Sequence, residues 1–277
     1  MIDGKTRLIA HLGFPTESFK APMIYNPYFA KHGINAFVVP MGSRPEDFSE
    51  FFRLLFKLSN IHGALITMPH KVPTVGLLNE ASVSVKVAGA CNAVRVEPDG
   101  KIVGDMFDGE GFVRGVLRKG RKLAGARVFV TGNGGVGSAI AASFAKAGVA
   151  EIALFDAYPS AMNGLAERLK ANYPDLEVKA GSNDPADFDV VVNATPLGMK
   201  PNDPLPMDVT RIAPSTFVGE VVMKAEITPF LAAARERGCE YQIGTDMLFE
   251  QIPAYLEFFG FGTTTAEELR SLAQIHY

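Results

Sequence analysis

The chain has 277 residues, of which 47% are hydrophobic and 21% charged, and its formal net charge is -3 at pH 7. This is the composition of a globular protein long enough for two domains, and it excludes a disordered or low-complexity chain. Basic residues cluster only at 118–122, which argues against nucleic acid or an anionic membrane as a partner. Apolar runs are too short to cross a bilayer and no signal segment is visible, so we expect a cytoplasmic monomer or homodimer.

The two cysteines, Cys91 and Cys239, are far apart in the sequence and show no metal-ligand or redox spacing. We expect both to be buried, reduced thiols. The five histidines form no HxH or HExxH pattern, so no metal site is predicted.

The first hundred residues alternate short β-branched runs with amphipathic stretches. Strands are predicted at 7–13, 35–41 and 63–68, and helices at 22–32 and 45–58. Strand and helix in alternation predict a mostly parallel sheet. The pattern then changes at "AVRVEPDGKIVG", where Pro98-Asp99-Gly100 between two alternating runs predicts a hairpin.

A second alternating series starts with a helix from Asp108 to about Leu117. Strands follow at 126–130, 151–157, 176–180, 187–199 and 216–223, then a helix at 227–238 and a short strand at 239–244. From Gly244 the chain is helical and leaves the alternation. We therefore predict an α/β protein of two domains. Residues 1–105, completed by 244–277, form a substrate domain with a mostly parallel sheet, and residues 106–243 form a doubly wound Rossmann domain that binds NAD.

A glycine-rich loop supports this second domain. Gly132, Gly134 and Gly137 form GxGxxG directly after a strand and directly before an amphipathic helix. Such a loop lets the backbone approach a pyrophosphate, and the helix N-terminus offers unpaired amides, so the predicted cofactor contacts also include Asn133, Gly135 and Val136. The alternative is a plain strand-to-helix turn rich in glycine.

Asp156 closes the next strand, where such folds place the acidic group that accepts from the adenosine ribose hydroxyls. Its carboxylate would repel a 2′-phosphate, and no arginine follows in "DAYPSAMNG". These residues predict that NAD is preferred over NADP. The alternative is that Asp156 simply caps the next helix.

A nicotinamide cofactor implies hydride transfer, and oxidation of an alcohol then needs a base for the hydroxyl proton. In "ALITMPHKVP" a proline ends an apolar run and Lys71 follows two residues later. A lysine there is most often a solvated loop charge. A lysine amine can instead serve as the base when burial and a carboxylate neighbour adjust it.

Six segments occur in an order that resembles the shikimate dehydrogenases. They are "TMPHK", "GACNAV", "GDMFDGEGF", "GNGGVGSA", "NATPLGM" and "GTDMLFEQ", and the resemblance runs nearly end to end. It implies that Lys71 and Asp108 are the catalytic pair and that Thr67, Asn92 and Gln251 contact the substrate. It also implies that "NATPLGM" and "GTDMLFEQ" lie near the cofactor, through Asn193, Thr195, Pro196 and Gly244.

Each of these positions also has an ordinary structural interpretation. Asp108 precedes a helix and is placed to cap it, Asn92 is placed to bond its own backbone, and Gln251 is placed on a helix surface. Thr67 has the type of a common strand residue.

The chain departs from the family in its first loop. The family reads like "GxPIxHSxSP", in which two serine hydroxyls hold the substrate carboxylate, whereas "GFPTESFKAP" has Phe19 and Ala21 at those places. Ser18 lies one residue away and Lys20 lies between them, so either is a candidate replacement. Loss of two charge-assisted hydrogen bonds, each about 1.5–3 kcal/mol, predicts weak binding of shikimate.

Four further positions are apolar where the family is usually polar: Leu65 for Asn, Met106 and Phe107 for "NT", and Met223 for Tyr. Together the resemblance and its departures predict an NAD-dependent oxidoreductase for a shikimate- or quinate-like cyclic hydroxy acid, with altered or weak activity on shikimate. Two alternatives stay open: an ordinary shikimate or quinate dehydrogenase with rearranged carboxylate binding, and a non-catalytic NAD-sensing regulator. Retention of both Lys71 and Asp108 argues against the regulator.

Overall fold

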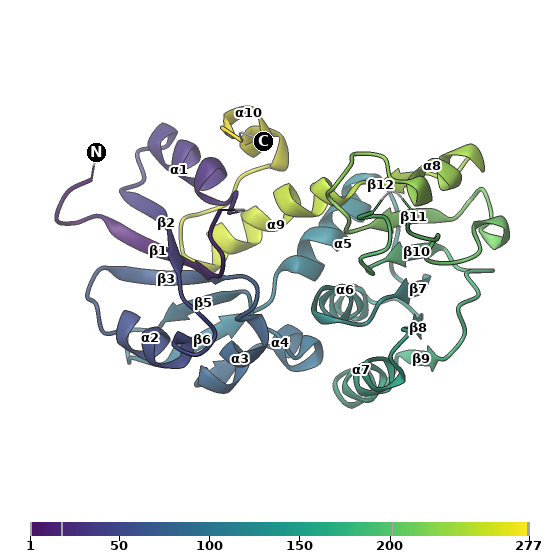
Figure 1. Ribbon diagram of the computed structural model, residues 1–277, viewed down its shortest axis with the longest axis horizontal. Helices are drawn as coiled ribbons and strands as arrows, with labels where there is room; N and C mark the ends of the chain where they lie inside the picture. Colours follow the sequence, from purple (N-terminus) through teal and green to yellow (C-terminus); the bar gives the residue numbers. More distant parts are fainter. Residues whose placement is uncertain (1, 18, 201, 276–277) are drawn as a thin grey trace. The chain divides into compact units, whose positions relative to one another are not determined.

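The computed structural model describes residues 2–17, 19–200 and 202–275, and these residues form two compact units. Unit 1 comprises residues 1–85, 89–107 and 252–277, and unit 2 comprises 86–88 and 108–251. Each unit carries one six-stranded sheet within its described residues. Figure 1 shows the strands of both sheets. The prediction of two α/β domains, the second a Rossmann domain, is confirmed.

Unit 1 has a mixed sheet of order β2-β1-β3-β5-β6-β4. The strands β1, β2 and β3 are parallel, whereas β5 is antiparallel to both β3 and β6. The predicted hairpin is the β5–β6 pair, with Ala93 opposite Asp105. Its elements are β1 (Arg7–Gly13), α1 (Pro22–Lys31), β2 (Ala36–Gly42), α2 (Phe48–Leu55), β3 (Ile61–Ile66), α3 (Lys71–Thr74), a 3₁₀ turn (Val75–Leu77), β4 (Glu80–Ala81), β5 (Ala93–Val96), β6 (Ile102–Asp105) and α10 (Ala266–Leu272). Helix α4 (Val83–Ala88) is divided between the units, since residues 86–88 belong to unit 2.

Unit 2 has a parallel sheet of order β12-β11-β10-β7-β8-β9. Numbered from its own first strand this order is 3-2-1-4-5-6 read from β9, which is the doubly wound arrangement of dinucleotide-binding domains. Helices α6 and α7 lie side by side on one face of this sheet and α8 lies on the other (Figure 1). The elements are α5 (Asp108–Arg118), β7 (Arg127–Thr131), α6 (Gly135–Lys146), β8 (Glu151–Phe155), α7 (Pro159–Asn172), β9 (Glu177–Ala180), β10 (Val190–Asn193), a 3₁₀ turn (Val209–Arg211), β11 (Phe217–Glu220), α8 (Pro229–Glu236) and β12 (Tyr241–Gln242).

Helix α9 (Gly244–Phe258) belongs to both units, because the division falls between Gln251 and Ile252. The sequence placed all of 244–277 with the first domain. Its first residues instead pack in unit 2, where a Cβ on Gly244 would overlap the carbonyl of Val222. Its last turn packs in unit 1, where Phe258 contacts Phe107 edge to face with ring centroids 5.5 Å apart.

The β-branched runs fill the two cores as expected from burial of apolar surface. In unit 2, Val128, Val130, Val190 and Val192 from neighbouring strands are fully buried with Phe112 of α5. Cys91 and Cys239 are buried free thiols, as predicted. None of the helices described is long and apolar enough to cross a membrane.

Candidate functional site

Lys71 stands at the first position of α3, just beyond the end of β3 in unit 1. The segment before it is fixed to the sheet, since the Thr67 amide donates to the Leu12 carbonyl over 2.8 Å. The Lys71 carbonyl accepts from the Cys91 amide over 2.9 Å, and the side chain is partly buried. The lysine is therefore held by backbone bonds on both sides.

His70 anchors this segment from inside. It is 1% exposed, stacks on Phe48 with ring centroids 3.9 Å apart, and its Nε2 lies 2.8 Å from the Ser43 carbonyl. Burial lowers the pKa of His70. A neutral, stacked imidazole thus orients the backbone from which Lys71 projects.

Asn92, also in unit 1, is buried at 1% exposure. Its Oδ1 accepts from the Phe107 amide over 2.9 Å, and its carbonyl accepts from the Ile66 amide over 2.8 Å. The residue therefore joins the end of β3 to the segment after β6. This structural role differs from the alternative in the sequence analysis, because Oδ1 bonds the backbone of Phe107 and not that of Asn92 itself.

The end of β1 and the end of β3 meet around Gly13. A Cβ at this position would lie 2.7 Å from Cζ of Phe19 and 2.9 Å from the Met68 carbonyl, and closer still to Cγ2 of Thr67. The Phe19 ring stacks on His11 with centroids 4.1 Å apart. Ser18, a predicted substrate contact, lies outside the described residues, and Lys20 is partly buried. At the position where the resemblance implies a serine hydroxyl, this chain therefore presents the aromatic ring of Phe19.

The apolar departures do not share one environment. Leu65 on β3 is 5% exposed, and Met106 and Phe107 are 1% and 6% exposed, so all three are buried in unit 1. The Phe107 ring packs edge to face on Tyr255, with centroids 4.9 Å apart. Met223, in unit 2, is 52% exposed. Met106 and Phe107 are thus core residues of unit 1, and their apolar character reflects packing.

In unit 2, Asp108 is the first residue of α5 and is 5% exposed. Acidic residues in a first helical turn interact favourably with the helix dipole. The next residue, Gly109, lets α5 approach α6 closely, because a Cβ there would overlap the carbonyl of Ala139. This packing fixes the start of α5, and with it the Asp108 backbone, against the helix that follows the glycine loop.

The glycine loop joins β7 to α6 as predicted. Gly132 has φ +86°, and a Cβ on it would lie 2.7 Å from the Thr195 amide nitrogen. A Cβ on Gly137 would overlap the Gly132 carbonyl oxygen. These two glycines are required by close packing within the loop.

Gly134 and Gly135 are different, because a Cβ at either would meet nothing within 4 Å. Both are exposed, and Gly134 caps α6 without any side-chain acceptor for the helix amides. Asn133 is buried, and its Oδ1 has no hydrogen-bond partner in the described chain. Open space over a helix N-terminus whose first amides have no side-chain acceptor fits a dinucleotide phosphate, whereas Asn133 Oδ1, an acceptor, suits a donor group.

Asp156 follows β8 and is partly buried. Its Oδ2 accepts from the Asn133 amide over 2.5 Å and its Oδ1 accepts from the Tyr158 amide over 2.8 Å. Tyr158 is the N-cap residue of α7. Both carboxylate oxygens therefore accept backbone amides of the two neighbouring loops. This is a structural role, but it is not the predicted helix cap, because no side chain caps the first amides of α7.

The turn after β10 is built by the polar residues predicted to lie near the cofactor. Asn193 is fully buried, and its Oδ1 accepts from the Thr195 hydroxyl over 2.6 Å. The Thr195 hydroxyl accepts from the Leu197 amide over 3.1 Å, and Pro196 between them is exposed. Since Gly132 packs on the Thr195 backbone, this turn and the glycine loop adjoin.

Gly244 and Gln251 both lie on the part of α9 assigned to unit 2. Gly244 is buried against the Val222 backbone, which explains the glycine by packing alone. The backbone and Cβ of Gln251 pack close to Gly111 of α5, and its buried Oε1 has no hydrogen-bond partner in the described chain. An unpartnered buried amide oxygen is consistent with a ligand contact.

Glu220 is a buried acid at the end of β11 that the sequence analysis did not single out. It is fully buried, and its Oε2 accepts from Asn193 Nδ2 over 3.4 Å. Burial raises the pKa of Glu220, and hydrogen bonds from Thr228 and Asn193 oppose the rise. A glutamate ending a strand beside a predicted cofactor residue was a visible signal for a buried polar group.

Replacing Glu220 by glutamine should raise the melting temperature at pH 8 and leave it unchanged near pH 4. A raised folded-state pKa means that the acid's stability contribution is complete below its ordinary value of 4.5 and is lost as pH rises through the folded value. Glu220→Gln keeps the neutral form, and each 1 kcal/mol corresponds to roughly 2–4 °C in a chain of this size. Thermal melts at pH 4, 6 and 8 test this. Exposed Glu226→Gln is the control, and a pH-independent change contradicts the expectation.

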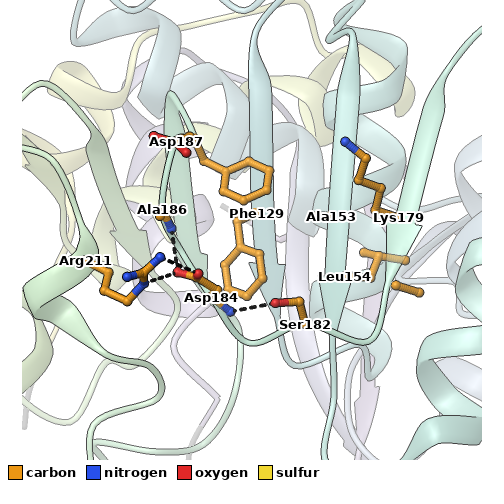
Figure 2. Close-up of a pocket in the computed structure, with 11 residues that line it drawn as sticks. Phe129, Ala153, Leu154, Lys179, Ser182, Asp184, Ala186, Asp187 and Arg211 are labelled. Atoms are coloured by element: carbon orange, nitrogen blue, oxygen red, sulfur yellow. Dashed lines mark hydrogen bonds and ion pairs between the residues drawn. The ribbon is translucent and has the colours of Figure 1, made fainter.

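A pocket of about 240 Å³ in unit 2 lies apart from these residues. Its lining comes from β7, β8, β9 and the segment 182–188, together with Arg211 (Figure 2). The Arg211 guanidinium pairs with the Asp184 carboxylate over 2.6 Å. The lining contains none of the predicted cofactor residues, so we assign it no part in the site. No group of three or more His, Cys, Asp or Glu side chains placed to hold a metal occurs in the described ranges.

Comparison with known proteins identifies one family. Residues 12–94 match the model of the shikimate dehydrogenase substrate binding domain. The chain is 34% identical over 254 residues to the shikimate dehydrogenase (NADP(+)) of Rubrobacter xylanophilus, covering 90% of this chain and 89% of that protein. Other matching curated relatives, 29 to 33% identical, carry the same name.

Solved structures agree on the fold. Shikimate 5-dehydrogenase from Listeria monocytogenes, in complex with shikimate and NAD, gives a TM-score of 0.90 at 24% identity and covers 98% of this chain and 97% of that one. Quinate dehydrogenase from Corynebacterium glutamicum, in complex with NAD, gives 0.86 at 27% identity, with 96% and 98% covered.

The cofactor prediction from the sequence was wrong. It gave NAD preference over NADP from the carboxylate of Asp156, whereas the curated relatives are named as NADP(+) enzymes. The physical reason is visible at the end of β8: this carboxylate accepts two backbone amides, so an acid here has a structural role and its presence alone does not select NAD.

Proposed function

Because the chain belongs to the shikimate dehydrogenase family and is an oxidoreductase of that type, we propose that it uses NADP, as its curated relatives are named, to oxidise a cyclic hydroxy compound other than shikimate. Activity on shikimate itself is weak. The observation that carries this proposal is Phe19, whose ring stacks on His11 where the resemblance implies a serine hydroxyl.

The glycine loop and the N-terminus of α6 hold the dinucleotide phosphates at the open positions Gly134 and Gly135. The unpartnered Oδ1 of Asn133 is an acceptor, so it can bind a hydroxyl of the cofactor but not a phosphate oxygen. A bound nicotinamide supplies the acceptor for the substrate hydride. Asn193, Thr195 and Pro196 support this loop from the neighbouring turn.

Lys71 takes the proton from the substrate hydroxyl at its Nζ. His70 holds its backbone, and Asn92 joins the strand before it to the segment after β6. Asp108 is the second member of the catalytic pair, and Thr67 and Gln251 contact the substrate. These roles follow from the family to which the chain belongs and from the burial of Asp108 at the start of α5.

Steady-state kinetics with NADP test the proposal. We expect kcat/KM for shikimate below the usual enzyme range of about 10⁴–10⁸ M⁻¹s⁻¹, and a value inside that range for at least one other ring polyol or hydroxy acid. Shikimate turnover inside that range contradicts the altered substrate. Lack of NADP reduction with every compound in such a screen contradicts the dehydrogenase itself.

A further inference from the structure

His11 is a polar residue in the middle of the apolar strand β1. Its neighbours Ile9, Ala10 and Leu12 are fully buried, and His11 itself is 8% exposed. Its Nδ1 is buried and, in the described parts of the chain, has no hydrogen-bond partner. A buried polar atom without a partner lowers the stability of the folded protein by about 1–3 kcal/mol, so a histidine at this position needs an explanation.

The strand alternation places this imidazole on the same sheet face as the proposed substrate residues. Gly13 lies two positions further on, and its missing Cβ would point at Thr67 and Phe19. In the parallel register of β1 and β3, His11 is directly beside Leu65, and paired residues share a face. His11 therefore adjoins the position at which this chain has an apolar residue where the family usually has asparagine.

The charge at this place is also defined. Burial, and secondarily the positive charge of Lys71, lower the pKa of His11 to about 4. At neutral pH the imidazole is uncharged and offers one donor and one acceptor.

Phe19 and the neutral His11 offer little stabilisation to a carboxylate. Phe19 contributes a ring face, and the imidazole that it covers has no positive charge with which to offset the desolvation of an anion. A hydroxyl or carboxamide, in contrast, matches one neutral donor or acceptor beside an aromatic face.

From these observations, and resting on the proposed function, we infer that His11 is a specificity-determining residue whose Nδ1 hydrogen-bonds an uncharged polar group of the substrate, at the place where the family's substrate carries its carboxylate. The imidazole supplies the polar group that Leu65, on the neighbouring strand, does not offer. The substrate is accordingly a neutral ring polyol or the carboxamide of a ring hydroxy acid.

Isothermal titration of shikimate and of its neutral carboxamide to the intact protein tests this inference. We expect the carboxamide to bind at least about tenfold more tightly than shikimate. His11→Leu should lose about tenfold in carboxamide affinity, whereas His11→Asn, which keeps a polar atom near the Nδ1 position, should retain most of it. The variant His11→Val/Leu65→Asn should reduce the preference for the neutral compound.

Two controls exclude a folding defect as the cause: the melting temperature of each variant, and a change at a second histidine of unit 1. His62 bonds the Phe259 carbonyl over 2.6 Å, so His62→Leu should lower the melting temperature without changing the ratio of the two affinities. Unchanged carboxamide affinity in His11→Leu overturns the inference. A wild-type protein that binds shikimate more tightly than the carboxamide, or binds neither, also overturns it.

NADP reduction measured on the same samples separates this inference from the proposed function. Carboxamide binding that depends on His11 without any turnover contradicts the dehydrogenase and supports the His11 hydrogen bond. Turnover that is the same in wild type and His11→Leu supports the dehydrogenase and contradicts the His11 hydrogen bond.

Discussion

Replacing Lys71 by alanine should lower kcat by about 10²–10⁴ with the best substrate found, while the affinity for NADP changes little. General base catalysis contributes factors of this size, and the cofactor loop lies in unit 2 whereas Lys71 belongs to unit 1. Lys71→Arg should lose a similar factor, because a guanidinium keeps the charge but does not release a proton at working pH.

Lys101→Ala provides the matched control. This exposed lysine of unit 1 pairs with Glu80 over 3.0 Å, and loss of such a surface pair costs at most about 1 kcal/mol. Turnover should stay at the wild-type value. If Lys71→Ala keeps wild-type turnover, Lys71 is the solvated loop charge that its position after a proline first suggested. If Lys71→Arg keeps it, the residue supplies charge and not proton transfer.

The fold was accessible from the sequence because periodicity and turn chemistry agree in most of it. The Pro98-Asp99-Gly100 turn lies between β5 and β6 as predicted, and the apolar runs of the second series located the strands of the parallel sheet in unit 2. A helix after Asp156 was expected, but no range was given for α7, since its first two turns carry Asn163 and Gly164, residues more typical of loops. The unit boundary inside α9 leaves no mark on the sequence, because one continuous helix serves two cores.

The site was accessible in part. Glycine spacing located the loop, but only the structure separates the glycines that packing requires from those that leave open space. Met106 and Phe107 were taken with the departures from the family that predict an altered substrate, although the sequence does not determine which way their side chains point. His11 was overlooked inside an apolar run, where its signal was a single polar residue.

A glycine-to-alanine change should lower the stability at one position of the loop and leave it nearly unchanged at another, three residues away. Gly137→Ala places a methyl group onto the Gly132 carbonyl, so we expect destabilisation of about 1–3 kcal/mol or more and a lower melting temperature. Gly134→Ala places its methyl in open space at φ -69°, which any residue adopts, so stability should change by no more than about 0.5 kcal/mol.

NADP affinity completes the comparison. The Gly134 methyl fills space over the N-terminus of α6, so we expect NADP to bind at least about tenfold more weakly to a variant that melts like the wild type. Calorimetric titration and thermal melts on both variants measure the two effects. Wild-type NADP affinity in Gly134→Ala would mean that the loop is only a packed turn, because a phosphate held close to the backbone cannot share its place with a methyl group.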